Sequence, residues 1–276
     1  MSTGPRRIGL RAVFARPGYR RLWAARTVSQ WGDVFATVAL SLLVFDLTGS
    51  PLGVSAVVVA EIAPVLLLAP LAGTLVDRLP RVRVMIAADL WRALLAALLI
   101  LLGGNVAAVY VIAFGLSLGA VLFNPAANSA LPALVQDEEL VAANSGIWTA
   151  AVLSQIALAP VAGVLYGTFG PGPAFGLNAA SFLVSAALFI GLRLPAGARS
   201  ADRRGFFADA VAGVRVLASD ALLRALGVGQ LFAALSAGAT SALLVVLARD
   251  HLRLPPSGYG LLLGAIGVGA VLGPLL

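Results

Sequence analysis

Four polar side chains interrupt an apolar stretch near the N-terminus. Arg26, Gln30, Asp33 and Thr37 are spaced by 4, 3 and 4 residues, which places them on one face of a helix. A charge inside a long apolar segment is costly and normally faces protein or water and serves a function. A carboxylic acid in such a low-dielectric cavity can take up and release a proton. We therefore expect this face to line a central cavity, with Asp33 as the proton-coupling candidate and Gln30 beside it.

Four charges besides Asp33 lie inside apolar runs. Arg26 is interpreted as a contact for an anionic substrate or as the partner of Asp33, bridged by water because the two lie about 10 Å apart along the helix. Glu61 stands before two prolines and is either a second coupling candidate or bonded to a neighbouring helix. Asp89 and Arg92 are three residues apart, so they can pair with each other and are predicted to be structural.

The composition defines the class of protein that carries these charges. The chain has 276 residues, of which 60% are hydrophobic and only 11% charged, and its mean hydropathy is +0.99. So few charges cannot cover a soluble surface, which indicates an integral membrane protein. No long stretch alternates apolar and polar residues as barrel strands must. We expect eight spanning helices, at Leu22–Asp46, Leu52–Val76, Val84–Leu102, Val106–Phe123, Gly146–Thr168, Pro173–Leu192, Leu222–Ala248 and Gly258–Leu276.

The same composition argues against several functions. There is no cysteine and a single histidine, so we expect no disulfide, no metal site and no cofactor. The glycines of "GVGAVLG" follow no strand and do not match a dinucleotide fingerprint, and small-residue helix packing explains them better. No nucleophile has a partner histidine. We expect no enzymatic activity.

The arginines predict the orientation in the membrane. All 19 basic residues are arginine, and they lie between apolar runs rather than on a polar fold, so nucleic acid is not expected as a partner. Fifteen of them fall in three segments on one side of the membrane: the N-terminal tail, residues 78–83 and residues 193–224. By the positive-inside rule the N-terminus is cytoplasmic, and the chain lies in the cell (inner) membrane. Aromatic residues near helix ends are expected to be interfacial anchors: Trp23, Trp91, Trp148, Tyr110 and Tyr166.

The chain divides into four parts. Residues 1–21 form a basic cytoplasmic tail, residues 22–192 a six-helix bundle, residues 193–220 a charged cytoplasmic linker and residues 221–276 two further helices. Segments 41–73 and 241–276 share the order of apolar helix, proline turn and apolar helix, and parallel repeats of six helices are a known transporter plan. On this plan the second repeat is incomplete, and a missing C-terminal half or a second chain would complete it. Residues 124–144 are expected to form a short surface helix.

The turn after the second expected helix carries a recognisable pattern. In "GTLVDRLPRVR", Gly73, Asp77, Arg78 and Arg81 match the loop 2–3 signature of the major facilitator superfamily, with Pro80 in place of its second glycine. The sequence resembles that family here. The resemblance implies that the loop holds the first bundle against the eleventh helix of the second. Orientation by positive charge alone accounts for the arginines but not for Asp77.

Other segments extend the resemblance over nearly the whole chain. "APVAG" is similar to the antiporter motif of helix five, with Pro160 and Gly163 matching and Ala159 in place of glycine. "WAARTVSQWGDVFATVAL", "LPALVQDEELVAANS" and "GYGLLLGAIGVGAVLG" resemble exporters of drugs and siderophores, such as macrolide and enterobactin efflux proteins. The resemblance implies an all-α membrane fold of twelve helices, of which this chain supplies the first eight.

The implied function is secondary active transport. The resemblance implies efflux of a small amphipathic, drug-like or siderophore-like compound across the lipid bilayer, in exchange for protons. Two alternatives stay open: a non-transporting fragment of such a transporter, and a membrane scaffold or interaction module built on the same bundle.

The orientation is directly testable, because the chain contains no cysteine that would react in the background. Cysteines introduced at Ser2 and Ser200 should resist a membrane-impermeant thiol reagent in intact cells, since positive charge holds both segments inside. A cysteine at Ser257 should react with the same reagent. Labelling of the Ser200 variant from outside would reverse the predicted topology.

Overall fold

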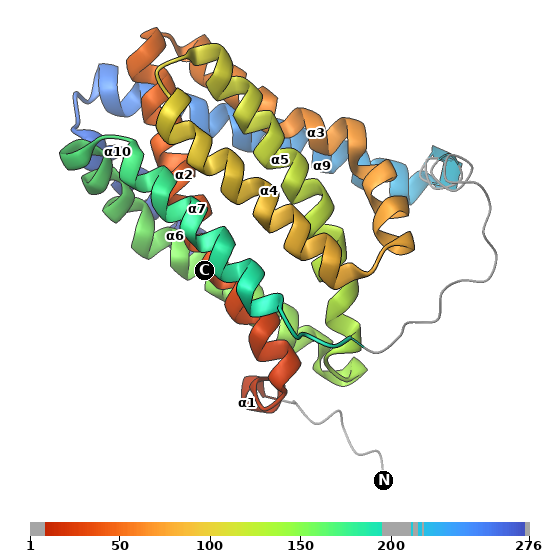
Figure 1. Cartoon of the computed structure of the whole chain (residues 1–276). Helices are drawn as coiled ribbons and strands as arrows, with labels where there is room; N and C mark the ends of the chain where they lie inside the picture. Colours follow the sequence, from red (N-terminus) through yellow and green to blue (C-terminus); the bar gives the residue numbers. More distant parts are fainter. Residues whose placement is uncertain (1–8, 195–210, 212–214, 217, 274–276) are drawn as a thin grey trace.

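The computed structural model describes residues 9–194, 211, 215, 216 and 218–273, and every regular element in these ranges is helical (Figure 1). The predicted all-helical membrane fold is thereby confirmed. Short turns of tighter or wider helix occur at Leu131–Ala133, Asp137–Glu139 and Leu247–His251. The α-helices are α1 Leu10–Phe14, α2 Pro17–Thr48, α3 Pro51–Arg78, α4 Arg81–Leu102, α5 Val106–Ala130, α6 Leu140–Phe169, α7 Gly172–Phe189, α9 Ala221–Val246 and α10 Pro256–Leu272.

Each of the eight expected membrane segments coincides with one of the helices α2–α7, α9 and α10. Within the described ranges, seven helices are long and apolar enough to cross a membrane. The helix α10 has 17 residues, somewhat fewer than the roughly 20 that a bilayer core requires. Most of the expected linker, residues 193–220, lies outside the described residues.

Local capping defines the end of α2 and the starts of α3 and α5. Gly49 ends α2 with a φ of 58°, a left-handed conformation that glycine adopts without strain. The Ser50 hydroxyl oxygen then accepts the Leu52 amide at 3.2 Å, and the Asn105 side chain accepts the Ala108 amide at 3.1 Å. Such caps satisfy amides that have no partner inside the helix.

Two expectations about segment ends are wrong. The helix α2 already begins at Pro17, so the last five residues of the expected tail are helical. Residues 124–144 form no separate surface helix, because α5 continues through Pro125 to Ala130 and two short turns lead into α6. Ala126 and Ala127 are fully buried, so packing against other helices keeps this segment helical.

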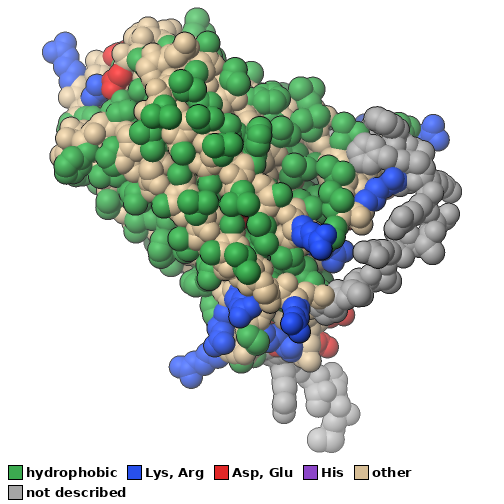
Figure 2. All heavy atoms as spheres, viewed as in Figure 1, with side chains coloured by type: hydrophobic (Ala, Val, Ile, Leu, Met, Phe, Trp, Pro, Cys, Tyr) green, Lys and Arg blue, Asp and Glu red, His purple; other side chains and the backbone are tan. Residues whose placement is uncertain are grey.

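The helices pack in an order that differs from their order in the chain (Figure 1). The helix α2 contacts α6 and α7, α4 contacts α5 and α7, and α3 packs on α5. The helix α9 lies along α3, and α10 lies along α6. We call the end of the bundle where α2 begins the tail end, and the end where α2 finishes the far end. In the view of Figure 2, most arginine side chains gather toward the tail end.

Close contacts fix two of these helix pairs. A Cβ atom on Gly32 would lie 2.0 Å from the Ser181 Oγ, so α2 and α7 approach at a distance that only glycine permits. A Cβ on Gly260 would lie 2.2 Å from the Ala159 carbonyl oxygen, which brings α10 equally close to α6. Small residues hold membrane helices together in this way. Lipid tails are as apolar as large side chains, so close van der Waals packing, and not the hydrophobic effect, favours helix association.

The tail end of α2 is also bonded to α6. The Tyr19 hydroxyl donates to the Ala143 carbonyl oxygen at 3.0 Å, and the Trp23 indole donates to the Gly146 carbonyl oxygen at 3.1 Å. The Arg16 Nε lies 2.6 Å from a carboxylate oxygen of Glu139, which is buried. These bonds hold α2 and α6 at a fixed spacing at the tail end. Just beyond them lie Arg26, Gln30, Asp33 and Thr37, which we call the polar stripe of α2.

Apolar side chains form two main clusters toward the two ends of the bundle. The tail-end cluster includes Met85 and Phe189, and the far-end cluster includes Leu42 and Phe175. Along α2, α4 and α7, Gln30, Asp33, Asp89, Arg92 and Asn178 fall between the two clusters. The middle of the bundle therefore contains a group of polar and charged side chains.

Substitution of Gly260 tests the contact between α6 and α10. Gly260→Ala should lower the thermal unfolding temperature of the purified protein, because the added methyl forces the helices apart at a cost of about 1–3 kcal/mol. Gly269→Ala on the same helix is the control, since a Cβ there meets nothing within 4 Å. It should leave stability unchanged or raise it by up to about 1 kcal/mol. Equal melting of the two variants would contradict the contact.

Candidate functional site

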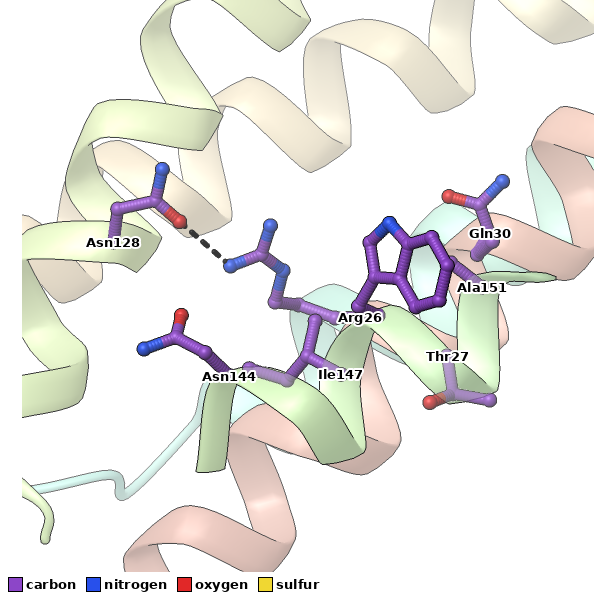
Figure 3. Close-up of a pocket in the computed structure, with 8 residues that line it drawn as sticks. Arg26, Thr27, Gln30, Asn128, Asn144, Ile147 and Ala151 are labelled. Atoms are coloured by element: carbon purple, nitrogen blue, oxygen red, sulfur yellow. Dashed lines mark hydrogen bonds between the residues drawn. The ribbon is translucent and has the colours of Figure 1, made fainter. Parts of the chain in front are cut away.

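A polar cavity of about 340 Å³ lies between α2, α5 and α6 (Figure 3). Its size is within the range of about 300–1,000 Å³ that small-molecule sites occupy. The lining combines amides, one guanidinium, an indole and aliphatic groups. The residues are Arg26, Thr27, Gln30, Asn128, Asn144, Ile147, Trp148 and Ala151.

Arg26 reaches across this cavity. Its Nη1 donates to the Asn128 Oδ1 of α5 at 2.8 Å (Figure 3). Among the described residues Arg26 forms no direct ion pair with Asp33. A guanidinium has five N–H donors, and those that Asn128 does not use are available to an anionic or carbonyl group in the cavity.

A smaller cavity of about 70 Å³ continues along the same face of α2. Gln30 lines both cavities, so they adjoin at its side chain. All four members of the predicted stripe therefore face cavity space between α2 and the helices opposite. The lining of the smaller cavity is Gln30, Asp33, Val34, Thr37, Val38, Gln155, Ala159 and Leu263.

Asp33 is surrounded by other ionisable groups at electrostatic range. Asp89 and Arg92 are close enough to interact electrostatically with Asp33. Asp33 in turn interacts electrostatically with Glu61. Glu61 lies on α3 and lines neither of the two cavities. Its backbone carbonyl oxygen accepts a hydrogen bond from the Ser117 hydroxyl of α5, so this position also joins two helices.

A tyrosine from α10 completes the surroundings of this region. Tyr259 is fully buried, and its hydroxyl has no hydrogen-bond partner among the described residues. It lies near Ser41 and within electrostatic range of Glu61. The Ser41 hydroxyl instead donates to the Thr37 carbonyl oxygen at 3.0 Å. Tyr259 thus adds a buried hydroxyl from α10 to this polar region of α2.

Asp89 and Arg92 form a buried ion pair, as their spacing predicts. An Arg92 Nη2 donates to one carboxylate oxygen of Asp89, and the Ser185 hydroxyl of α7 donates to the other at 2.7 Å. The Arg92 guanidinium also stacks on the rings of Phe123 and Phe182, at 4.6 Å and 4.2 Å from their centroids. These contacts join α4, α5 and α7 and leave neither charge without a partner.

A second charged cluster lies at the far end. The Arg249 Nη2 lies 3.0 Å from the Asp46 Oδ1, and the Tyr166 hydroxyl donates to the Asp46 Oδ2 at 2.7 Å. The three residues come from the ends of α2 and α6 and from the wide turn after α9. Tyr166 was expected only as an interfacial anchor, and its hydrogen bond to Asp46 was not predicted. Asp46 thus ties together three helices that are distant in the sequence.

The loop between α3 and α4 is shorter than the gap between the expected helices, which were predicted to end at Val76 and to begin again at Val84. The helix α3 continues to Arg78, so Gly73 lies inside it and the turn consists of Leu79 and Pro80. Gly73 therefore does not make the turn. A Cβ there would meet nothing within 4 Å. Asp77 and Arg78 are exposed at the tail end, and Arg81 is half-buried.

The antiporter-type motif with Pro160 and Gly163 lies on α6, the fifth spanning helix, where α10 crosses it. A Cβ on Gly163 would come 2.5 Å from the Pro256 carbonyl oxygen, so this glycine admits the start of α10. Pro160 packs against Gly264 of the same helix. Proline has no amide hydrogen and leaves the carbonyl of residue 156 without its usual helical donor. The motif shapes the crossing of the two helices.

Sequence reasoning missed most of the wall opposite α2. Asn144, Trp148 and Gln155 of α6 line the cavities, and Trp148 was expected to be an interfacial anchor. The signal was present, since residues 144, 148, 151 and 155 repeat the spacing of 4, 3 and 4 found on α2. Asn128 had no such signal, because only the extension of α5 brings it to the cavity.

The buried pair and the cavity carboxylate should respond differently to substitution. Asp89→Ala leaves Arg92 buried without its counter-charge, which should destabilise the protein by about 3–5 kcal/mol. Asp33→Asn should change stability little, because Asp33 has no ion-pair partner to leave uncompensated. Thermal unfolding of both purified variants measures the difference. An Asp89→Ala variant as stable as the unmodified protein would contradict the structural role.

Comparison with known proteins agrees with this architecture. The family described as transmembrane secretion effector matches residues 9–276. An uncharacterised transporter of the major facilitator type, YfiS of Bacillus subtilis, is 30% identical over 172 residues, which are 62% of this chain and 41% of YfiS. Macrolide efflux protein A of Streptococcus pyogenes is 25% identical over 178 residues, which are 63% of this chain and 44% of that protein. The matched region thus spans less than half of either relative.

A solved structure shows the same fold. The crystal structure of a bacterial homologue of the iron transporter ferroportin, in an inward-facing state, superposes with a TM-score of 0.65 at 18% identity. The match covers 94% of this chain and 67% of that one. With a family match over nearly its whole length and a shared fold, the chain belongs to the transmembrane secretion effector family of major facilitator superfamily transporters.

Proposed function

We propose that this chain is part of a secondary exporter that moves a small amphipathic, drug-like or siderophore-like compound out of the cell in exchange for protons. The observation that carries the proposal is the polar cavity along α2, which places Arg26, Gln30 and Asp33 inside an otherwise apolar bundle. The name of the macrolide efflux relative supports the direction and the class of substrate.

The cavity suits an amphipathic substrate. Trp148 and Ile147 offer apolar and aromatic surface, while Arg26 and Asn144 offer hydrogen bonds and charge (Figure 3). Sites for small molecules commonly combine mostly apolar walls with a few polar groups that fix orientation. Asp33 lies deeper, in the adjoining cavity, so its protonation can change the charge beside a bound substrate without direct contact.

The transport cycle that we propose is alternating access. The excess of arginine at the tail end favours a cytoplasmic tail and an inner-membrane location, which puts the Asp46, Tyr166 and Arg249 cluster on the outer face. That cluster ties α2 and α6 to the turn after α9 and would hold the outer face closed while substrate enters from inside. Rocking of two bundles around a shared midplane site is the general mechanism of such folds.

The loop between α3 and α4 has a place in the same cycle. We propose that Asp77, with Arg78 and Arg81, binds the second bundle when the tail end closes. The first bundle would comprise residues 22–192, and residues 221–276 would begin the second, joined by the linker at 193–220. The remaining helices of the second bundle would come from further chain or from another copy.

The proton-coupling role of Asp33 is tested by removing its charge. In a transporter completed with the remaining helices of the second bundle, Asp33→Asn should abolish substrate movement driven by a proton gradient in membrane vesicles, because the amide cannot exchange a proton. Binding of substrate should persist, since Arg26 and the α6 wall are unchanged. Glu138→Gln is the matched control, because Glu138 is an exposed carboxylate at the tail end, and its gradient-driven transport should be normal.

The result distinguishes the parts of the proposal. Normal gradient-driven efflux by Asp33→Asn would remove this residue from the mechanism. Loss of binding together with transport would instead assign Asp33 to substrate recognition.

A further inference from the structure

An apolar groove of about 580 Å³ lies on the outer side of the bundle at the tail end, between α3, α4 and α5. It shares no lining residue with the two cavities along α2. Its volume exceeds that of the cavity at Arg26, and its walls are almost wholly apolar. The side chains that define it are Leu75 and Leu79 on the first wall, Ala87 and Trp91 on the second, and Leu118 and Leu122 on the floor.

The packing of the three helices creates the groove. The helices α3 and α4 are joined by the short turn at Leu79 and Pro80, yet both pack on α5 and hardly on each other. Gly119 of α5 allows α4 to approach closely, since a Cβ there would lie 2.6 Å from the Arg92 Cγ and 3.2 Å from the Trp91 Cδ1. The Trp91 indole donates to the Gly115 carbonyl oxygen at 2.8 Å, which holds its ring in place as a wall.

The groove opens onto the surface that faces the bilayer. Leu90 and Leu94, next to it on α4, are 49% and 56% exposed. Large apolar side chains exposed along a spanning helix face lipid tails rather than water. The groove is therefore accessible to acyl chains from the side of the bundle, without passing through the central cavity.

Charge at the mouth of the groove favours one kind of lipid. Arg83 is exposed, lines the groove at its tail end and forms no ion pair within the described part of the chain. Arg81 lies two residues before it. A guanidinium binds phosphate through parallel N–H donors, and basic pockets between spanning helices on the cytoplasmic side bind anionic head groups.

We propose that this groove is a binding site for an anionic phospholipid. One acyl chain lies between α3 and α4 on the floor of α5, and the head-group phosphate binds Arg83. The inference rests on the orientation given under Proposed function, which places the tail end at the cytoplasmic leaflet. A bound lipid would fill the space between α3 and α4 behind the turn that carries Asp77.

Binding is measured on the purified chain in detergent by native mass spectrometry, with phosphatidylglycerol as the probe. Three comparison compounds separate the contributions. Phosphatidylcholine tests the net charge of the head group, diacylglycerol tests the acyl chains alone, and soluble glycerophosphoglycerol tests the head group alone. Phosphatidylglycerol should bind most tightly, and the soluble head group should not bind measurably, because the acyl chain supplies most of the contact.

Two variants with matched controls locate the site. Arg83→Gln should weaken phosphatidylglycerol binding about five-fold, the ~1 kcal/mol that one basic side chain contributes near an anionic membrane surface. Ala87→Phe fills the groove from an exposed position and should weaken binding about ten-fold, the effect of excluding about two methylene groups. Arg20→Gln, at an exposed arginine elsewhere at the tail end, and Ala97→Phe, at an exposed alanine of α4 outside the groove, should bind normally.

Two outcomes would overturn the proposal: equal binding of phosphatidylcholine and phosphatidylglycerol, or equal losses in Ala87→Phe and Ala97→Phe. Binding of the soluble head group as tightly as the whole lipid would also overturn it, since the groove would then play no part. These results are independent of the Asp33→Asn transport measurement, so failure of the lipid site and failure of the exporter proposal are distinguishable. Only reversal of the topology, seen by labelling at Ser200, would count against both.

Discussion

The need to neutralise charge inside an apolar bundle governs the centre of this protein. Asp89 and Arg92 meet that need through each other, through the Ser185 hydroxyl and through two aromatic rings from α5 and α7. A buried pair of this kind adds little stability relative to apolar packing, but removal of one partner is severe. The pair therefore fixes how α4, α5 and α7 meet, and the apolar clusters pack on either side of it.

Asp33 is placed differently. It lies beside cavity space, within electrostatic range of Asp89, Arg92 and Glu61, but without a counter-ion of its own. The pair is self-contained, which leaves Asp33 and Glu61 as carboxylates of this region without an ion-pair partner among the described residues. This separation of a structural pair from an unpaired carboxylate is the physical basis for the coupling role that we propose.

The contacts between distant segments have two chemical forms. Glycines bring α10 against α6 and α2 against α7 at distances that exclude any side chain, and van der Waals contact holds these crossings. Asp46 instead binds α6 and the turn after α9 through an ion pair and a hydrogen bond at a partly exposed end. Polar contacts at an exposed end exchange with water more readily than close-packed glycines separate. The far-end cluster is thus a polar, partly exposed contact, whereas the crossing of α6 and α10 is close-packed.

The sequence by itself determined the membrane class, the position of the helices and the residues that share a face of α2. These follow from hydropathy and from the helical period, which are local properties. It also predicted the pairing of Asp89 with Arg92, because three residues separate them on one helix. The tertiary structure alone decided that Arg26 bonds to Asn128, that α6 supplies the wall facing Asp33, and that Asp46 meets Arg249, 203 residues away. The helical period states which residues lie together on one helix, but which face meets which depends on packing between segments that are distant in the chain.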